Sequence, residues 1–189
     1  EKEPFIKMIF VLKGCSSIPE AEIRDHKSEK EMLQDWQDFM TAVDPDIITG
    51  YNIINFDLPY LITRAQNYFK IPGYGKFGRV IGSTSKIKNA VYQSKAMGMR
   101  DTKDINMEGR IQLDMLMIMH VEHKLSSYSL NNVSYHFLKE QKEDVHHSII
   151  TKLHESNPDT RKRIAVYCLK DAILPLRLMD KLMSLYNYT

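Results

Sequence analysis

The hydrophobic and polar positions predict that short strands alternate with helices over the first part of the chain. Residues 5–12 form a short, β-prone apolar run, which predicts a well-buried strand. Ser28 followed by Glu31 is a capping-box pattern, and apolar residues then recur at helical spacing over 32–43. We therefore expect a helix that ends before Asp44, which precedes a proline.

The next segment predicts another strand and another helix, followed by loops. Residues 46–52 are typical of a strand, and Pro59 suits the first turn of a helix that begins at Leu58. Residues 71–110 are rich in Gly and Lys and poor in periodic patterns. We expect loops there, with a hairpin at about 91–111.

The rest of the chain is dominated by helical patterns. Residues 111–114 predict one more strand, which runs into a Met-rich helix over 115–123. Three further helices are expected over 127–138, 145–154 and 158–186, and Pro175 should kink or divide the last one. Strands that alternate with helices before a helical tail predict an α/β domain in which helices pack on a small mixed sheet.

Composition narrows the class of protein without identifying it. The 189 residues suit a single domain over 1–189 that buries roughly 70% of its unfolded surface. Hydrophobic residues make up 43% and charged residues 26%, which excludes a wholly disordered or collagen-like chain. No apolar run is long enough to cross a membrane. The two cysteines fit a reducing compartment, and the start at Glu1, without an initiator Met, suggests the cut edge of a longer protein.

The charge is unevenly distributed although its sum is only +2. Residues 20–46 are rich in acids, whereas residues 76–110 collect lysines and arginines. The basic segment has two equally good interpretations, a surface that follows phosphates and an ordinary solvated loop.

Two groups of polar residues are candidates for chemistry. The first follows the strand over 46–52 and contains Asn52, Phe56 and Asp57 at the strand's exit, where α/β sheets commonly bind ligands. A plainer interpretation is that Asp57 caps the helix that begins at Leu58, and the pattern taken alone favours this cap.

The second candidate group is Tyr167 and Asp171. These residues are four positions apart in a predicted helix, so a phenol and a carboxylate project from the same face. The plainer interpretation is a tyrosine at the edge of the core beside an exposed aspartate, which is the commoner outcome for such a pair.

Taken together, the two groups resemble a known family. The N-x3-F-D pattern at the strand exit and the later helical Y-x3-D pattern resemble the second and third exonuclease motifs of the proofreading domain of family B DNA polymerases. Between them, Ser129-Leu130-Asn131-Asn132-Val133 resembles the family's S/T-L-x2-h element, and Lys142-Glu143-Asp144-Val145 its K-x2-h element. Longer stretches over 44–52, 138–150 and 167–176 resemble a eukaryotic replicative member, and four motifs in the right order are a specific signal.

The resemblance implies a fold and an activity. The fold would be ribonuclease-H-like, and the activity would be 3′→5′ hydrolysis of the terminal phosphodiester at a mismatched DNA end. Asp57 and Asp171 match the ligands of two divalent ions, Mg²⁺ or Mn²⁺, and Tyr167 matches the tyrosine that helps orient the attacking water.

Further residues match positions that contact DNA in the family. Asn52 and Phe56 would hold the frayed terminal nucleotides, the ring by stacking. Ser129 and Leu130 would contact single-stranded DNA, and Lys142 would bring positive charge near the scissile phosphate, although a plain surface lysine is the alternative. The hairpin resembles the family's strand-separating hairpin, with backbone-contacting charges at Arg100, Lys103 and Arg110.

The same resemblance implies partners and a location. They are the single-stranded 3′ primer end of DNA, the remainder of a polymerase chain and its accessory subunits, in the nucleus and without a membrane. An alternative of a different class is a non-catalytic DNA-binding or scaffolding module that keeps the exonuclease fold.

One departure from the family's motifs predicts low activity. The family's first motif, D-x-E on its opening strand, is absent, so we expect these 189 residues to be inactive or nearly so. Without the opening strand, the strand over 5–12 should lack its usual neighbour and expose unpaired backbone, which invites strand exchange or dimerisation.

Other residues have structural interpretations. No zinc site is expected at His120 and His123, and Trp36 is expected to anchor the core.

Overall fold

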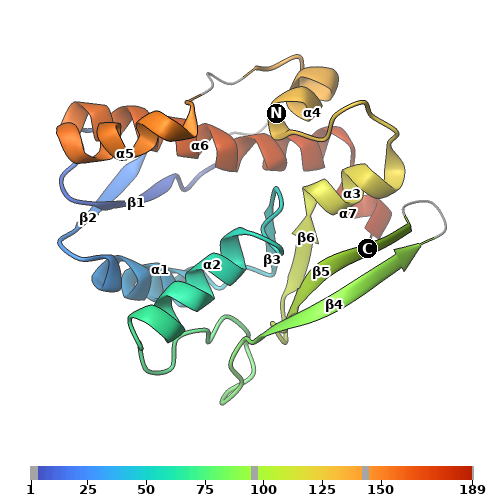
Figure 1. The fold of residues 1–189 in the computed structure, drawn as a ribbon, viewed down its shortest axis with the longest axis horizontal. Coiled ribbons are helices and arrows are strands. Elements are labelled where there is room, and N and C mark those ends of the chain that lie inside the picture. The colour runs from blue at the N-terminus through green and yellow to red at the C-terminus, as the bar shows by residue number, and fades with distance from the viewer. Residues whose placement is uncertain (1–3, 95–97, 142–144, 189) are drawn as a thin grey trace. The chain divides into compact units, whose positions relative to one another are not determined.

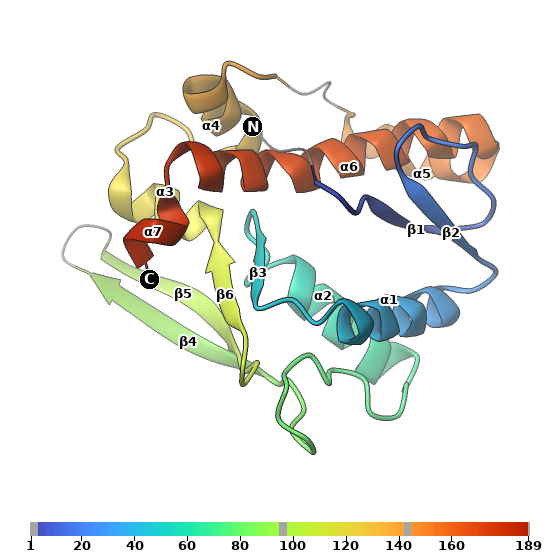
Figure 2. The ribbon, with the colours of Figure 1, turned by 180° about the vertical axis from the view of Figure 1, so that it is seen from behind.

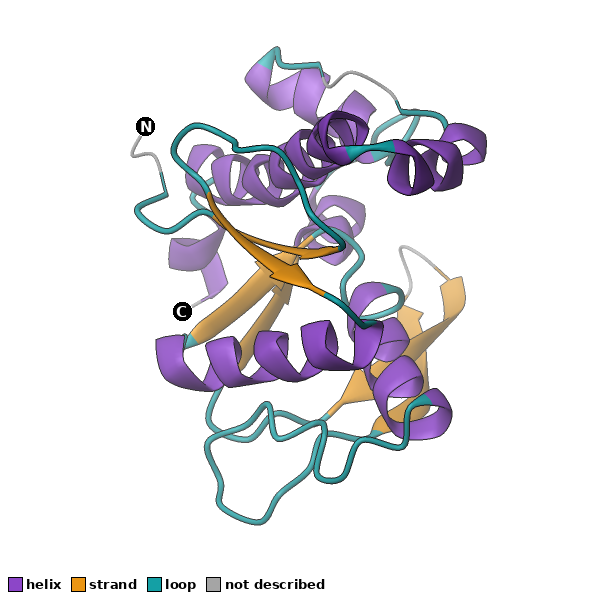
Figure 3. Cartoon of the chain, turned by 90° about the vertical axis from the view of Figure 1, so that its left-hand side faces the viewer, coloured by secondary structure: helices purple, strands orange, loops and turns teal. Residues whose placement is uncertain are grey.

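The computed structural model describes residues 4–94, 98–141 and 145–188. The chain divides into two compact units. The terminal unit comprises Glu1–Met32 and Ser129–Thr189, and the central unit comprises Leu33–Tyr128. The expectation of a single domain over 1–189 stays a prediction. Both units mix short strands with helices, drawn in orange and purple in Figure 3, and this agrees with the predicted α/β class.

The terminal unit contains a pair of parallel strands. Strand β1 (Met8–Leu12) pairs with β2 (Glu22–His26), so that Met8 lies opposite Glu22 and Leu12 opposite His26. The sequence did not predict β2, because the strand is mostly charged and its apolar partner lies elsewhere in the chain. β1 therefore has a neighbour on one edge, β2, and the expectation that it lacks its usual neighbour and exposes unpaired backbone stays a prediction. All residues of β1 are half-buried, so the prediction of a well-buried strand was wrong.

Four helices complete the described part of the terminal unit. They are α4 (Leu130–Leu138), α5 (His147–Ser156), α6 (Pro158–Lys181) and α7 (Ser184–Tyr188). Helices α4 and α5 both pack against α6, which forms the long axis of this unit (Figure 1). Arg161, which is buried in α6, donates hydrogen bonds to the carbonyls of Gly14 and His154 at 2.6 and 3.0 Å. This side chain thereby ties α6 to the loop after β1 and to the end of α5.

Helix α6 continues through Pro175. The proline is fully buried beside Leu174, and the helix ends only at Lys181, before Met183 adopts a left-handed φ of 52°. The helix is therefore not divided at Pro175, and the alternative expectation, a kink there, stays a prediction. A proline removes one backbone donor, but burial of its ring in an apolar core compensates for that loss.

Helix α1 (Glu29–Val43) begins and ends as predicted. The Glu31 N–H donates to the Ser28 hydroxyl at 3.3 Å and the Ser28 N–H donates to the Glu31 carboxylate at 3.2 Å, which is a capping box. After Val43, Asp44 takes a left-handed φ of 48° and the helix stops.

The central unit contains two strand pairs. Strand β3 (Ile47–Gly50) pairs in parallel with β6 (Ile111–Asp114), and β4 (Ile87–Ser94) forms an antiparallel hairpin with β5 (Gly98–Ile105), as Figures 1 and 2 show. The hairpin thus lies earlier in the chain than the expected range of 91–111. The reason is that residues 106–110 form the turn into β6 and belong to neither strand.

Helices and an aromatic core support these strands. Helix α2 (Asp57–Thr63) continues as a π-helix, η1 (Arg64–Tyr68), and α3 (Met115–Glu122) follows β6 directly. The core gathers Leu33, Leu58, Ile62, Ala65, Ile71, Tyr74, Phe77, Ile105 and Met107. Trp36 packs against this cluster, with its ring 5.4 Å from that of Phe77, so its predicted role as a core anchor is confirmed. Within the described ranges, no helix has the length and apolar character needed to cross a bilayer.

Candidate active site

The candidate site begins where β3 ends, in the segment that carries Asn52, Phe56 and Asp57. We call Gly50–Asp57 the strand-exit loop. Gly50 is required by close packing, because a Cβ atom there would lie only 2.4 Å from Cγ2 of Ile53. Asn52 adopts a left-handed φ of 64°, so the backbone reverses direction sharply as it leaves the sheet.

A buried carboxylate at the end of β6 holds this loop. Asp114 is 4% exposed, and its Oδ1 accepts from the Asn52 N–H at 2.8 Å while its Oδ2 accepts from the Ile54 N–H at 3.1 Å. Oδ1 also accepts from the Leu116 N–H at 3.0 Å and so caps α3. One side chain therefore fixes both the loop and the start of the next helix.

Two more side chains of the loop bind to neighbouring segments. The Tyr51 hydroxyl donates to the Tyr128 carbonyl at 2.5 Å. Burial, with the charge of Asp114 adding to it, raises the pKa of Tyr51, so the phenol keeps its proton and remains a donor at neutral pH.

Asn55 joins the loop to the hairpin. Its Oδ1 accepts from the Lys103 N–H at 2.9 Å and from the Thr102 hydroxyl at 3.2 Å, and the Lys103 ammonium lies 3.4 Å from its backbone carbonyl. Asn55, Thr102 and Lys103 border a cavity of about 670 Å³ over the hairpin, together with Asn89, Ala90, Val91 and Asp101.

This bonding leaves an aromatic ring and a carboxylate at the surface. Phe56 is 65% exposed, and Asp57 is an exposed residue at the start of α2. The N-cap of α2 is Phe56, and Asp57 is the first helical residue, so the interpretation of Asp57 as the cap is wrong. The loop can therefore offer Phe56 to a base and Asp57 to a cation on a fixed backbone.

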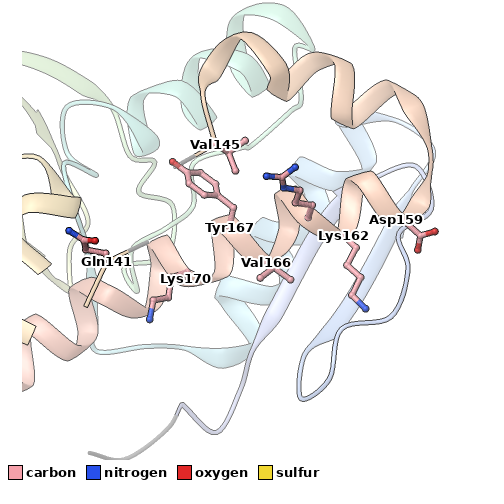
Figure 4. Close-up of a pocket in the computed structure, with 8 residues that line it drawn as sticks. Gln141, Val145, Asp159, Lys162, Val166, Tyr167 and Lys170 are labelled. Carbon is pink, nitrogen blue, oxygen red and sulfur yellow. The ribbon is translucent and has the colours of Figure 1, made fainter. Parts of the chain in front are cut away.

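The second predicted group lies on α6. Tyr167 and Asp171 are one helical turn apart in α6, as the spacing predicted. Both residues are half-buried, so the plainer interpretation of an exposed Asp171 is wrong. Tyr167 borders a cavity of about 490 Å³, and Figure 4 shows its ring extending from α6 toward Val145. The cavity is also lined by Gln141, Asp159, Lys162, Arg163, Val166 and Lys170.

One cation in that lining is held by an acid of the same unit. Lys170 donates to the Glu140 carboxylate, which also accepts from Arg177 at 2.7 Å. The hydrogen bond from Lys170, with that from Arg177, holds the pKa of Glu140 below its usual range. Lys170, the immediate neighbour of Asp171 in the chain, is thus paired with Glu140.

The remaining predicted residues have varied surroundings. Ser129 is the N-cap of α4 and accepts from the Asn132 N–H at 3.3 Å, with Leu130 as the first helical residue. Arg100 lies in β5 opposite Tyr92, and its side chain is outside the described residues, as is the whole of Lys142. Their roles toward DNA stay predictions.

The surroundings of Arg110 contradict its expected contact with DNA. Its side chain is only 4% exposed, donates to the carbonyls of Phe77 and Pro45, and lies 2.9 Å from Oδ1 of Asp44. Asp44 also accepts from Arg79 at 2.8 Å, and that bond holds the pKa of Asp44 below its usual range. Arg110 belongs to an internal network and lies outside the hairpin, so the expected contact with a DNA backbone is wrong.

The predicted residues thus form two local groups. Asn52, Phe56 and Asp57 share the strand-exit loop of the central unit, and Tyr167 and Asp171 share α6 of the terminal unit. The convergence of Asp57 with Asp171 stays a prediction. Sequence reasoning missed Asp114, although an aspartate between a strand and a helix is the usual signal of an N-cap.

Comparison with known proteins gives one consistent family. Residues 1–133 match the family described as DNA polymerase family B, exonuclease domain. The DNA polymerase delta catalytic subunits of Dictyostelium discoideum, Bos taurus and Glycine max are 56%, 54% and 53% identical to this chain over 189, 187 and 188 residues. These matches cover 100%, 99% and 100% of the chain, which spans 17% of the length of each relative.

Proposed function

Because this chain belongs to the exonuclease-domain family of family B DNA polymerases, we propose that it forms the proofreading 3′→5′ exonuclease domain of a replicative polymerase of the delta type. The observation that carries the proposal is the strand-exit loop, in which Asp114 fixes the backbone while Phe56 and Asp57 remain exposed. The longer protein would be a DNA-directed DNA polymerase, and this part of it would remove errors.

The proposed fold is ribonuclease-H-like. The small parallel pair β3–β6, with α2 and α3 following its two strands, supports this proposal. The strand-exit loop lies at the carboxyl end of β3, and α/β folds commonly bind ligands at such strand ends.

The donor chemistry of Asp57 and Asp171 fits a hard divalent ion, Mg²⁺ or Mn²⁺, because both residues offer carboxylate oxygens from exposed or half-buried positions. When bound, such a pair of ions supplies positive charge to the phosphate under attack and to the leaving oxygen. Within residues 4–94, 98–141 and 145–188, no set of three His, Cys, Asp or Glu residues gathers into a metal site. The missing carboxylates would come from the D-x-E motif.

The chain's own residues have the following proposed roles. Phe56 stacks on the terminal base and Asn52 holds the frayed end, which suits removal of any nucleotide because stacking tolerates every base. The Tyr167 hydroxyl hydrogen-bonds and orients the attacking water. The water gives up a proton as its oxygen forms a bond to phosphorus, and the bond from phosphorus to the 3′ oxygen of the preceding nucleotide breaks. That 3′ oxygen takes up a proton, and the terminal nucleotide leaves as a nucleoside 5′-monophosphate.

Other residues are proposed to guide the DNA. Ser129 and Leu130 would contact the single strand, and Lys142 would add positive charge near the scissile phosphate. The hairpin, with Arg100 and Lys103, would separate strands so that the primer end reaches the site. The proposed partners are a single-stranded 3′ primer end, the rest of the polymerase chain and its accessory subunits, in the nucleus.

The test uses the full-length protein and a primer with a mismatched 3′ end. Asp57→Ala and Asp171→Ala should each lower the rate of nucleotide release by roughly 100-fold or more in Mg²⁺, while primer extension persists. Tyr167→Phe should lower it by about 10-fold or more. Asp180→Asn, which changes an exposed carboxylate on the same helix as Asp171, is the matched control and should leave the rate unchanged.

Full nuclease activity in Asp57→Ala would refute the proposed mechanism. A wild-type protein that binds single-stranded DNA but releases no nucleotide in Mg²⁺ or Mn²⁺ would instead support the non-catalytic module.

A further inference from the structure

We propose that Asp114 is a positioning residue of the exonuclease site, and that it sets the orientation of Phe56 and Asp57 without touching the substrate. This inference rests on the proposed function. It concerns a residue that the exonuclease motifs do not include, since Asp114 lies far along the chain from the strand-exit loop that it binds.

The first step of the argument is the bonding of the carboxylate itself. Both of its oxygens accept backbone N–H groups of the strand-exit loop, at Asn52 and Ile54. These two N–H groups flank Ile53, so the carboxylate binds the turn at two points. Two bonds fix the orientation of the turn as well as its position. At 4% exposure, water cannot readily replace either bond.

The second step is a relay through the backbone of the loop. The Asn52 carbonyl accepts from the Phe56 N–H at 3.0 Å, and the Ile53 carbonyl accepts from the Leu58 N–H at 3.0 Å. Phe56 and Leu58 are the two neighbours of Asp57. The Ile53 carbonyl belongs to the same peptide group as the Ile54 N–H, so Asp114 orients it directly, whereas the Asn52 carbonyl belongs to the peptide group between the two that Asp114 binds. The backbone on both sides of the proposed metal ligand is therefore tied to the segment that Asp114 holds.

The third step is backbone strain. Asn52 is held at a φ of 64°, which costs a non-glycine residue free energy unless its surroundings enforce it. The bond from the Asn52 N–H to Asp114 and the bond from the Phe56 N–H to the Asn52 carbonyl together hold this conformation. Without the bond to Asp114, we expect the loop to relax and the Asp57 carboxylate to leave its productive orientation.

The hydrogen-bonding chemistry of the Asp114 carboxylate makes the positioning role testable by substitution. An asparagine at 114 keeps one oxygen, which can still accept from Asn52 and Leu116, but it turns an N–H₂ group toward the Ile54 N–H. A serine at 114 can still cap α3, but it cannot reach both loop amides. Asp114→Asn and Asp114→Ser therefore damage the loop while sparing the helix cap.

The experiment measures nuclease kinetics and amide hydrogen exchange in the full-length protein. In Asp114→Asn, kcat for release of a 3′ nucleotide from single-stranded DNA should fall roughly 10-fold to 100-fold with KM nearly unchanged. Exchange at Ile54 should become about 10-fold faster while exchange at Asn52 stays slow. Asp114→Ser should lower kcat similarly, with fast exchange at both positions or at either one.

Asp38→Asn, an exposed carboxylate of α1 in the same unit, is the matched control and should change neither quantity. Primer extension by the same preparations reports whether each variant is folded. An unchanged kcat in Asp114→Asn and Asp114→Ser, in protein whose loop exchange is accelerated, would overturn the inference. Nuclease activity that survives Asp57→Ala would instead overturn the proposed function, so the two failures are distinguishable.

Discussion

At the scale of single residues, bonding partners decide whether a charge is available to a ligand. Arg110 was a candidate for binding DNA because it lies in a basic stretch of sequence. Its guanidinium instead donates to two backbone carbonyls and to Asp44, and its side chain is 4% exposed. Three partners around one planar group suit arginine and not lysine, so its place in the network reflects geometry and not net charge.

Glu140 gives a prediction of pH dependence at this scale. The hydrogen bonds from Lys170 and Arg177 hold its folded-state pKa below 4.5, its ordinary value. A depressed pKa means that the stabilisation is fully present above the unfolded-state pKa and is lost as the pH falls through the folded-state pKa. Glu140→Gln should therefore lower the free energy of unfolding at pH 7, by about 0.5–1 kcal/mol because the groups are partly exposed.

Urea unfolding of both proteins at several pH values measures this effect. The difference between wild type and Glu140→Gln should narrow below about pH 4.5 and vanish in stronger acid. A difference that stays constant from pH 7 down to pH 3 would contradict the assigned ion pairs. Glu155→Gln, an exposed acid of α5 in the same unit, serves as the control.

At the scale of elements, the contacts of Asn55 indicate that the strand-exit loop helps to hold the hairpin β4–β5 in place. Oδ1 of Asn55 accepts a hydrogen bond from the backbone N–H of Lys103 in β5 at 2.9 Å. The side chain thereby pairs a backbone donor on the edge of the hairpin. Asn55→Ala should make exchange of the Lys103 amide roughly 5-fold faster, as expected for the loss of about 1 kcal/mol.

Thr102→Val is the matched comparison for this contact. It removes only the hydroxyl that donates to Asn55 at 3.2 Å and leaves the bond from Lys103 in place. The Lys103 amide should then remain protected. Equal protection in wild type and Asn55→Ala would show that the hairpin is held by other contacts.

Elements defined by local patterns could be predicted from the sequence, and those defined by distant partners could not. The capping box at Ser28 and Glu31 fixed the start of α1, because both partners lie within one helical turn. Strand β2 was missed because its pairing with β1 is non-local. The sequence left open whether Pro175 kinks or divides its helix, because it does not reveal that the proline ring is buried.

The candidate site divides in the same way. Asn52, Phe56 and Asp57, like Tyr167 and Asp171, were found because each group occupies one short stretch whose spacing carries the pattern. Asp114 was missed because its function depends on bonds to Asn52 and Ile54, which fold from a different part of the chain. Sequence motifs identified side chains proposed to meet substrate, and the structure identified a side chain that holds them.

At the scale of the whole molecule, the number of proposed metal ligands limits what these 189 residues can bind. The proposed set contains Asp57 and Asp171, and the family's D-x-E motif, which would add two carboxylates, does not occur in these 189 residues. Affinity for a hard cation depends strongly on the number of charged ligands around it. The charge of Asp57 and Asp171 alone is therefore expected to bind the ion weakly.

Calorimetric titration with Mn²⁺ tests this expectation on two proteins, the 189-residue chain and a chain extended at its N-terminus by a strand that carries the family's D-x-E motif. We expect the extended chain to bind Mn²⁺ at least about 10-fold more tightly, because two more carboxylates join Asp57 and Asp171. It should also digest single-stranded DNA, whereas the shorter chain should be inactive or weak. Asp57→Ala in the extended chain should remove most of the gain in affinity. Equal affinity in both chains would mean that the carboxylates of these 189 residues bind the ion by themselves, and the predicted inactivity would then be wrong.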